Sequence, residues 1–186
     1  MQSHGRRRHA VTGAEMDFIN PILQRIPDSA KDIRLNLDSV LSRSSLEPDD
    51  ALGVAIAAAF AARSAELLRA LTPAAPETTA HAALSAAALM GMNNVWYPFV
   101  EMAGDDDLAT MRPELRMNAY ATHGGVARAK FEAYALAASI VGKCHHCVQS
   151  HYEVLKKEGW SLQQLRDVGR IAAVINATAL VLVAHG

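Results

Sequence analysis

The amino-acid sequence predicts an all-α fold, and the composition of the chain carries that prediction. Hydrophobic residues make up 51% of the 186 residues but aromatic residues only 5%, so much of the apolar content is Ala, Leu, Val and Met. Alanine is the best helix former, whereas strands favour β-branched and aromatic side chains. No segment of the sequence shows a strand pattern that competes with the helical one. We therefore expect close-packed helices and no sheet.

Length and charge narrow the range of functions. A chain of 186 residues can bury a sizeable core, and we expect a disordered extension over residues 1–15 followed by one helical domain over residues 16–186. The formal net charge is -1, and the mixed charges offer no basic field for nucleic acid. No apolar run reaches the roughly 18 residues of a membrane span, and no secretory signal is evident. The sequence thus indicates a cytoplasmic protein without nucleic-acid or membrane partners.

Proline and acidic residues divide the beginning of the domain into helices. Asp28 or Ser29 can cap a short helix that reaches Leu41. Pro48 suits the first turn of a second helical stretch, which is strongest over residues 51–71. We expect this second stretch to continue without a break.

An alanine-rich helix is expected next, over residues 77–92. Asn93 and Asn94 weaken the helical pattern, and Pro98 must kink or end whatever follows because it lacks a backbone N–H. The glycine and acidic residues at 104–107 indicate a loop. This helix is therefore expected to end near residue 92.

The next elements alternate helix and turn. Pro113 suits the first turn of a helix that reaches about Tyr120, and the glycine pair at 124–125 indicates a turn. A helix is expected over residues 128–141, and Gly142 is a plausible stop for it.

Two further helices complete the expected fold. The first carries both cysteines over residues 144–157 and ends at Gly159. Ser161 and Gln164 match a capping box, which begins the last helix, and that helix is expected to reach about Val183.

A faint internal repeat is visible in the apolar spacing. Residues 58–71 and 86–97 resemble residues 138–158 and 171–183. Because any two pairs of alanine-rich helices share some spacing, the sequence leaves open whether the fold contains a duplicated helical unit.

The cysteines and a nearby histidine form the chemically distinctive segment. The chain contains only two cysteines, Cys144 and Cys147, and His151 follows one helical turn later. At about 100° per residue, these three side chains share one apolar face of a helix, whereas His146 projects to the opposite side. The shared face is expected to point into the protein or toward a partly covered pocket.

This spacing suits a redox-active dithiol. The thiolate is the nucleophile, and a helix N-terminus lowers the pKa of a thiol from its ordinary value of about 8.5. His151 can act as a base or a proton relay, and a second thiol can convert a sulfenic acid into a disulfide. If the chain turns at Gly142 and folds back, the carboxylate of Glu132 could reach His151 and fix its tautomer.

Other interpretations of the same residues stay open. The Cys-x-x-Cys pair could be half of a zinc site completed by His151, His145 or Glu132, although the sequence has no second Cys/His pair at metal spacing. The two cysteines could also be inert core residues. No strand, glycine-rich loop and helix follow one another as in dinucleotide-binding proteins, so no flavin, haem or nicotinamide cofactor is expected. Because a second Cys/His pair is missing, we expect a redox-active dithiol rather than a resident metal.

The sequence also resembles a known family. Phe131-Glu132 followed by Cys144-x-His146-Cys147-x-x-x-His151 looks like the alkyl hydroperoxide reductase D (AhpD) family, within the carboxymuconolactone decarboxylase-like superfamily. Three further stretches resemble the family, namely residues 31–37, 88–95 and 115–118. The resemblance runs from about residue 20 to the end, whereas the extension through Met16 and the segment 98–110 depart from the family pattern.

The resemblance implies a compact, all-helical, AhpD-like homotrimer that reduces alkyl hydroperoxides in antioxidant defence. It implies that Cys147 attacks the peroxide and that Cys144 resolves the product. Glu132 and His151 would then deprotonate the nucleophile through a water, with His146 in a supporting role. A dihydrolipoamide-bearing protein would supply electrons, and the peroxiredoxin alkyl hydroperoxide reductase C would accept them. A non-enzymatic disulfide carrier, a decarboxylase-like enzyme and a zinc-binding helical protein remain alternatives.

Overall fold

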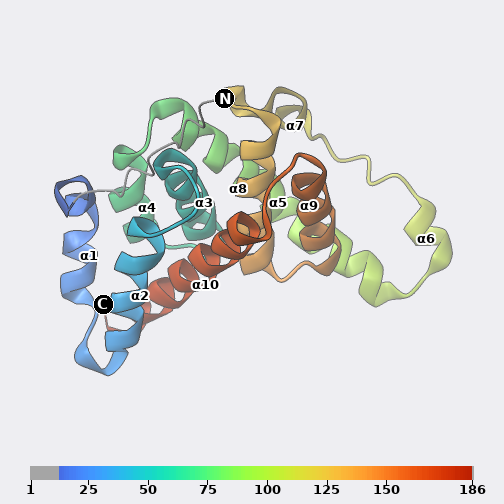
Figure 1. Cartoon of the computed structure of the whole chain (residues 1–186). Helices are drawn as coiled ribbons and strands as arrows, with labels where there is room; N and C mark the ends of the chain where they lie inside the picture. Colours follow the sequence, from blue (N-terminus) through green and yellow to red (C-terminus); the bar gives the residue numbers. More distant parts are fainter. Residues whose placement is uncertain (1–12, 186) are drawn as a thin grey trace, which may run out of the picture.

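The computed structural model describes residues 13–185, and helices account for the regular structure throughout that range (Figure 1). Within these residues there is no strand, which confirms the predicted all-α fold. Residues 1–12, most of the expected N-terminal extension, lie outside the described part.

The first elements are η1 Gly13–Ile19, α1 Asn20–Arg25, η2 Asp28–Ala30, α2 Lys31–Ser42, α3 Pro48–Ala61, α4 Ala65–Leu71 and η3 Thr72–Ala74. The others are α5 Glu77–Ala103, α6 Asp106–Thr110, α7 Asn118–Thr122, η4 His123–Gly125, α8 Arg128–Gly142, α9 His145–Lys157 and α10 Leu162–Ala184.

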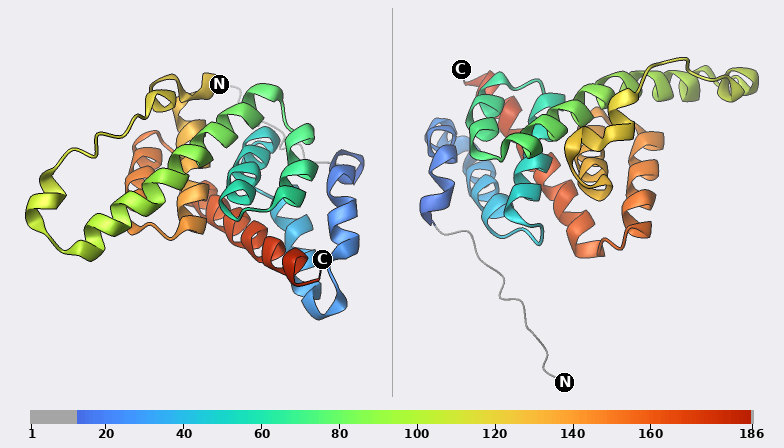
Figure 2. Two further views of the ribbon diagram at one scale, coloured as in Figure 1. Left: turned by 180° about the vertical axis from the view of Figure 1, so that it is seen from behind. Right: turned by 90° about the horizontal axis from the view of Figure 1, so that it is seen from above.

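Three helices form the centre of the fold. α3, α5 and α8 pack against one another, and α10 crosses α2, α3 and α8 (Figure 2). The small side chains of the predicted alanine-rich segments allow this close approach, because fully buried alanines lie along α3, α5 and α8. α9 packs on α8 and α5, so the cysteine-bearing helix lies against the rigid centre of the molecule.

The long helix α5 corrects one prediction. It was expected to end near residue 92, but it continues through Pro98 to Ala103. Asn94 helps to hold this part of α5, because its side-chain amide donates a hydrogen bond to the carbonyl of Ala138 on α8, at 3.1 Å. Pro98 removes one backbone hydrogen bond, but it does not end a helix that is anchored in this way on one side. The far end of α5 and the short helix α6 therefore project from the core as an arm (Figure 2).

Two other predicted boundaries were wrong. The stretch over residues 51–71 is not one helix, because the chain breaks between α3 and α4, where Arg63 has a positive φ of 58°. The helix expected from Pro113 begins only at Asn118. Glu114 has a φ of 53°, and a right-handed helix cannot run through a residue in that conformation. The capping box of Ser161 and Gln164 is confirmed at the start of α10.

The junctions α3–α4 and α8–α9 have the same local geometry. Arg63 and Lys143 both adopt the left-handed conformation, with φ of 58° and 57°. The next residues, Ser64 and Cys144, both act as N-caps whose side chains accept the backbone N–H three residues later, at 3.3 and 3.2 Å. This equivalence supports the internal repeat that the apolar spacing suggested, although only the second junction carries thiols.

One helix among the described residues, α10, is long and apolar enough to cross a membrane. Length and composition alone are weak evidence that a helix spans a membrane, because a core helix of a water-soluble protein can be equally long and apolar. The side chains of Val168, Ile171 and Ile175 are fully buried within the molecule. Packing in the core therefore explains the apolar residues on this face of α10, whereas Leu180 and Val183 near its end are exposed.

Candidate functional site

The two cysteines lie at the junction between α8 and α9. α8 ends at Gly142, and the left-handed conformation of Lys143 turns the chain so that Cys144 becomes the N-cap of α9. Cys144 and Cys147 form a disulfide with their Cα atoms 5.3 Å apart. Sγ of Cys144 accepts the backbone N–H of Cys147 at 3.2 Å. The Cys-x-x-Cys pair therefore lies at a helix N-terminus, where N–H groups favour a negative sulfur.

Burial follows the predicted helix face. Cys144 is 0% exposed, Cys147 is 3% exposed and His151 is 5% exposed. His146 is exposed, on another side of α9. The side chains that were expected to share one inward face therefore do so.

Glu132 joins this face from α8. The fold-back at Gly142 brings Oε2 of Glu132 to 2.7 Å from Nδ1 of His151. Because an ionised carboxylate can only accept hydrogen bonds, Nδ1 carries the proton in this pair. The other ring nitrogen, Nε2, lies 3.2 Å from Sδ of Met90. The carboxylate thus fixes the tautomer in which Nε2 is the basic atom of the neutral ring.

Two residues that were not anticipated complete the surroundings of Glu132. The hydroxyl of Tyr120 donates to Oε1 of Glu132 at 2.6 Å, and Nε of Arg128 lies 3.6 Å from the same oxygen. Burial alone would raise the pKa of Glu132, but the hydrogen bonds from His151 and Tyr120, together with the positive charges nearby, outweigh it. The pKa of Glu132 is therefore held below its usual value, and the buried carboxylate stays ionised.

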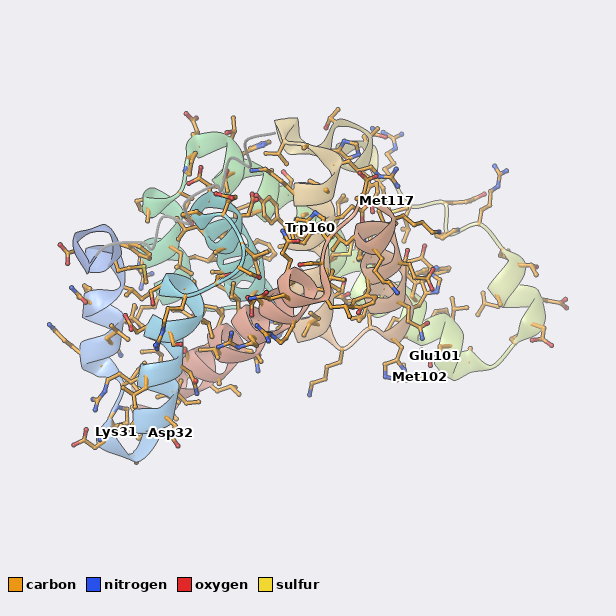
Figure 3. The ribbon with its side chains drawn as sticks, in the orientation of Figure 1. Lys31, Asp32, Glu101, Met102, Met117 and Trp160 are labelled. Atoms are coloured by element: carbon orange, nitrogen blue, oxygen red, sulfur yellow. A yellow bond between two sulfur atoms is a disulfide. The ribbon has the colours of Figure 1, made fainter. Side chains whose placement is uncertain are left out.

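A pocket of about 440 Å³ opens beside these residues. Cys147, His151 and Tyr120 line it, and Cys144 does not. A small molecule that enters the pocket would therefore meet the sulfur of Cys147 first. Met117, which Figure 3 labels beside α9, contributes another part of the wall and contacts the amide of Asn93 at 3.5 Å.

His146 lies at the edge of this pocket. Its ring stacks on that of Tyr97 from α5, with centroids 4.4 Å apart. Both residues also line a neighbouring pocket of about 590 Å³, which lies between α9 and the arm and includes Trp96. At the mouth of that pocket, His145 contacts Glu101 at 3.4 Å, and Figure 3 shows Glu101 on the projecting end of α5. His146 is thus near the dithiol although it lies off its buried face.

Among the described residues, the acidic, histidine and cysteine side chains of the site do not form a metal-binding cluster. Across residues 13–185, no group of three or more His, Cys, Asp or Glu side chains lies close enough to hold a metal ion. Both thiols are joined to each other in the described structure.

The structure brings four of the five predicted site residues into one buried group and leaves His146 at its rim.

The two residues that the sequence analysis missed, Arg128 and Tyr120, differ in how they could have been found. Arg128 lies four positions before Glu132 on the same helix, which is the spacing of helical ion pairs. Tyr120 lies on another helix, and no spacing rule connects it to Glu132.

Comparison with known proteins gives matches over most of the chain. The carboxymuconolactone decarboxylase family model matches residues 106–185, which include α8, α9 and α10. The chain is 44% identical over 168 residues to the alkyl hydroperoxide reductase AhpD of Rhodospirillum centenum, a match that covers 88% of this chain and 90% of the relative. It is 42% identical over 166 residues to that of Rhodopseudomonas palustris strain BisB18, covering 87% and 91%. It is 37% identical over 168 residues to that of Brucella canis, covering 88% and 95%.

Proposed function

The chain belongs to the alkyl hydroperoxide reductase AhpD family, and from that membership we propose that it is a thiol peroxidase that reduces alkyl hydroperoxides. One observation of the structure carries the proposal: Cys147 lines a pocket next to the paired side chains of His151 and Glu132. A thiol, a base and a group that orients the base are the parts that nucleophilic catalysis needs. In such a protein the reaction serves antioxidant defence.

The proposed reaction uses both thiols. The thiolate of Cys147 attacks the terminal peroxide oxygen, so an S–O bond forms, the O–O bond breaks and the alcohol leaves with a proton. The thiol of Cys144 then attacks the sulfenic sulfur of Cys147, the disulfide forms and water leaves. One hydroperoxide is reduced by two electrons, and an external dithiol must return those electrons to the disulfide.

His151 and Glu132 have distinct tasks in this scheme. Glu132 holds the proton on Nδ1, which leaves Nε2 to receive the proton of the Cys147 thiol through a water. The N-terminus of α9 stabilises the thiolate that results. His146, stacked on Tyr97 at the rim, supports the shape of the pocket entrance.

Burial of the disulfide suits a slender reductant. Cys144 is fully buried and Cys147 nearly so, so a reductant must reach the sulfur of Cys147 through the pocket. A dihydrolipoamide group is a dithiol at the end of a long, thin arm, and the 440 Å³ pocket can admit it. We therefore propose a lipoyl-bearing protein as the reductant, in the cytoplasm, with no further cofactor.

A disulfide electron carrier is the second candidate. The position of Cys144 favours it, because a sulfur that caps a helix N-terminus is a good leaving group in thiol–disulfide exchange. In that role the dithiol would pass electrons from the lipoyl protein to a peroxiredoxin, alkyl hydroperoxide reductase C. Both roles use the same residues, and one protein can perform both.

The arm supports a proposal about assembly. Four large apolar side chains on the second half of α5 and at the end of α6 are exposed, namely Val95, Phe99, Met102 and Met111. Exposed apolar side chains that form a contiguous patch mark interaction sites. We propose that they contribute to a homotrimer.

The deciding experiment measures peroxide consumption by reduced protein. Wild type, supplied with dihydrolipoamide and cumene hydroperoxide, is expected to turn over repeatedly, whereas Cys147→Ser is expected to be inactive. Without dihydrolipoamide, prereduced Cys144→Ser is expected to consume about one equivalent and to keep its sulfenic acid, because no resolving thiol is present.

Other outcomes select other functions. Wild type that ignores peroxide but exchanges disulfides with a peroxiredoxin would be a carrier only. Stoichiometric zinc in the purified reduced protein would favour the metal-binding alternative. A decarboxylase activity that survives in the Cys144→Ser, Cys147→Ser double variant would favour the decarboxylase-like alternative.

A further inference from the structure

Tyr120 reaches the site from outside the segment that carries the dithiol. It belongs to the short helix α7 and lines the same pocket as Cys147 and His151. Its ring packs edge-on against Phe131, with centroids 5.5 Å apart and the planes at 88°. This packing limits where the hydroxyl can point, so its direction toward Glu132 is set by the fold.

The two oxygens of Glu132 have separate partners. Oε2 pairs with Nδ1 of His151 at 2.7 Å, and Oε1 accepts the hydroxyl of Tyr120 at 2.6 Å. Arg128 approaches Oε1 only to 3.6 Å, which is beyond good hydrogen-bond distance. The hydroxyl of Tyr120 also lies 3.5 Å from Nδ1 of His151. Tyr120 therefore occupies the oxygen that His151 leaves free.

A second donor matters because Glu132 is completely buried. An ionised carboxylate away from water is costly unless hydrogen bonds satisfy its oxygens. Burial, together with the neighbouring Glu132, raises the pKa of Tyr120, so its hydroxyl keeps its proton and donates throughout the working pH range. The carboxylate thus has a permanent donor on one oxygen and the imidazole on the other.

We infer that Tyr120 is a positioning residue of the dithiol centre, which holds Glu132 ionised and turned so that Oε2 faces His151. This inference rests on the proposed function, because it assigns Tyr120 a part in activating Cys147. Without the hydroxyl, Glu132 would take up a proton at higher pH. A protonated Glu132 can donate that proton to Nδ1 of His151, so Nε2 would no longer be held as the free basic atom on the acidic side.

The test is the pH dependence of two rates in wild type and Tyr120→Phe. The first is kcat/KM for cumene hydroperoxide with dihydrolipoamide, and the second is alkylation of Cys147 by iodoacetamide in reduced protein, followed by mass spectrometry. In both, the acid limb is expected to move up by about one pH unit, the size of effect that one hydrogen bond to a charged group gives. Tyr152→Phe, which removes a hydroxyl from the neighbouring position on α9, is the matched control and should leave both profiles in place.

Two further variants separate positioning from a loss of packing. In a Glu132→Gln background, Tyr120→Phe should cause no additional shift, because the residue acts through the carboxylate. If Tyr120→Phe does not fold, as judged by thermal unfolding, Tyr120→Gln and Tyr120→Met give side chains of similar size with and without a donor. The acid limb of the pH–rate profile should then lie closer to that of wild type in Tyr120→Gln than in Tyr120→Met.

The outcomes are distinguishable from those of the peroxidase test. An unchanged acid limb in Tyr120→Phe, or an equal shift in the Glu132→Gln background, overturns the role of Tyr120 and leaves the peroxidase proposal intact. Wild type that does not consume peroxide overturns the peroxidase proposal, while the alkylation profile still reports on Tyr120.

Discussion

Oε2 of Glu132 lies 2.7 Å from Nδ1 of His151, although the residues are 19 positions apart and belong to different helices. The turn at Gly142 and Lys143 creates this contact by folding α9 back along α8. The pair converts an ordinary histidine into one with a defined proton position and a defined direction. The same hairpin places both sulfurs at the N-terminus of α9, so one turn of the backbone brings together the dithiol, His151 and Glu132.

Glu132→Gln should therefore impair the chemistry while leaving the fold in place. The amide is similar in shape but can turn an N–H toward His151, which would favour the wrong tautomer. We expect the rate of peroxide reduction at neutral pH to fall by about 100-fold, the lower end of the usual contribution of general acid–base catalysis, because His151 remains but with its proton on the wrong nitrogen. The rate of sulfenic acid formation on Cys147 in a single turnover measures this directly.

Glu153→Gln provides the comparison. Glu153 is exposed on α9, so its replacement changes the net charge equally without touching the pair of Glu132 and His151. Equal rates in wild type and Glu132→Gln, under conditions in which Cys147→Ser is inactive, would remove Glu132 from the mechanism.

Much of this centre could be predicted from the sequence because its parts obey helical spacing. Cys144, Cys147 and His151 recur at intervals of three and four, so their common face follows from 3.6 residues per turn. The glycine at 142 gave a reason for the chain to reverse, and reversal brings Glu132 back alongside α9. Tyr120 follows no such rule, because its approach depends on how α7 packs against α8, and this is a tertiary contact.

One of the boundaries that were wrong has a similar cause. The asparagines and the proline of α5 oppose a helix locally, but the hydrogen bond of Asn94 to α8 outweighs that local preference. Glu114 is the opposite case, in which a helix was expected and is missing. Pro113 suits the first turn of a helix, but the left-handed backbone of Glu114 interrupts it. At Asn94 a tertiary contact overrides intrinsic preference, which single-residue propensities cannot express.

Gly142→Ala should destabilise the protein because there is no room for a side chain at this turn. A Cβ atom there would overlap the side-chain amide of Asn94. Asn94 would have to move, and its hydrogen bond to Ala138 would be lost. We expect a loss of about 1–3 kcal/mol in the free energy of unfolding, the usual cost of overpacking, measured by urea denaturation.

Gly169→Ala is the control for this change. Gly169 lies within α10, and a Cβ atom there would meet nothing within 4 Å. Alanine in a helix is favoured over glycine by up to about 1 kcal/mol, so this variant should be as stable as wild type or more so. Equal stability of Gly142→Ala and wild type would show that Asn94 can move without cost.

Phe99→Glu should weaken the proposed assembly. Phe99 is 47% exposed on the projecting end of α5, together with Met102 at 79%. A charge at this position would be buried without a partner if the arm lies against a second copy. Light scattering measures the mass of the assembly. We expect the mass of three chains of 20.0 kDa each for wild type and a smaller mass for Phe99→Glu.

Leu35→Glu serves as the reference for this surface change. Leu35 is 58% exposed on α2, away from the arm, so its replacement should leave the mass unchanged. A single-chain mass for wild type at micromolar concentration would contradict the trimer, whatever the variants do.

Asp167 links the start of α10 to the loop before α3, and this link should make stability depend on pH. Its buried carboxylate accepts the backbone N–H of Ser45 and a guanidinium N–H of Arg170, both at 2.9 Å. Burial alone would raise the pKa of Asp167, but these bonds and the contact with Arg166 lower it below the ordinary value. A carboxyl group with a lowered pKa in the folded state stabilises that state above the unfolded pKa, and the contribution is lost as the pH falls through the folded pKa.

We therefore expect the free energy of unfolding to fall as the pH drops below about 4, where an unfolded aspartate takes up its proton. Asp167→Asn should lose about 1–3 kcal/mol at neutral pH, because the amide replaces bonds to a charge with weaker ones. The acid dependence should also be flatter in this variant than in wild type. Urea denaturation of both proteins between pH 3 and 7 tests the two statements together, and parallel curves would mean that Asp167 does not supply the pH-dependent part of the stability.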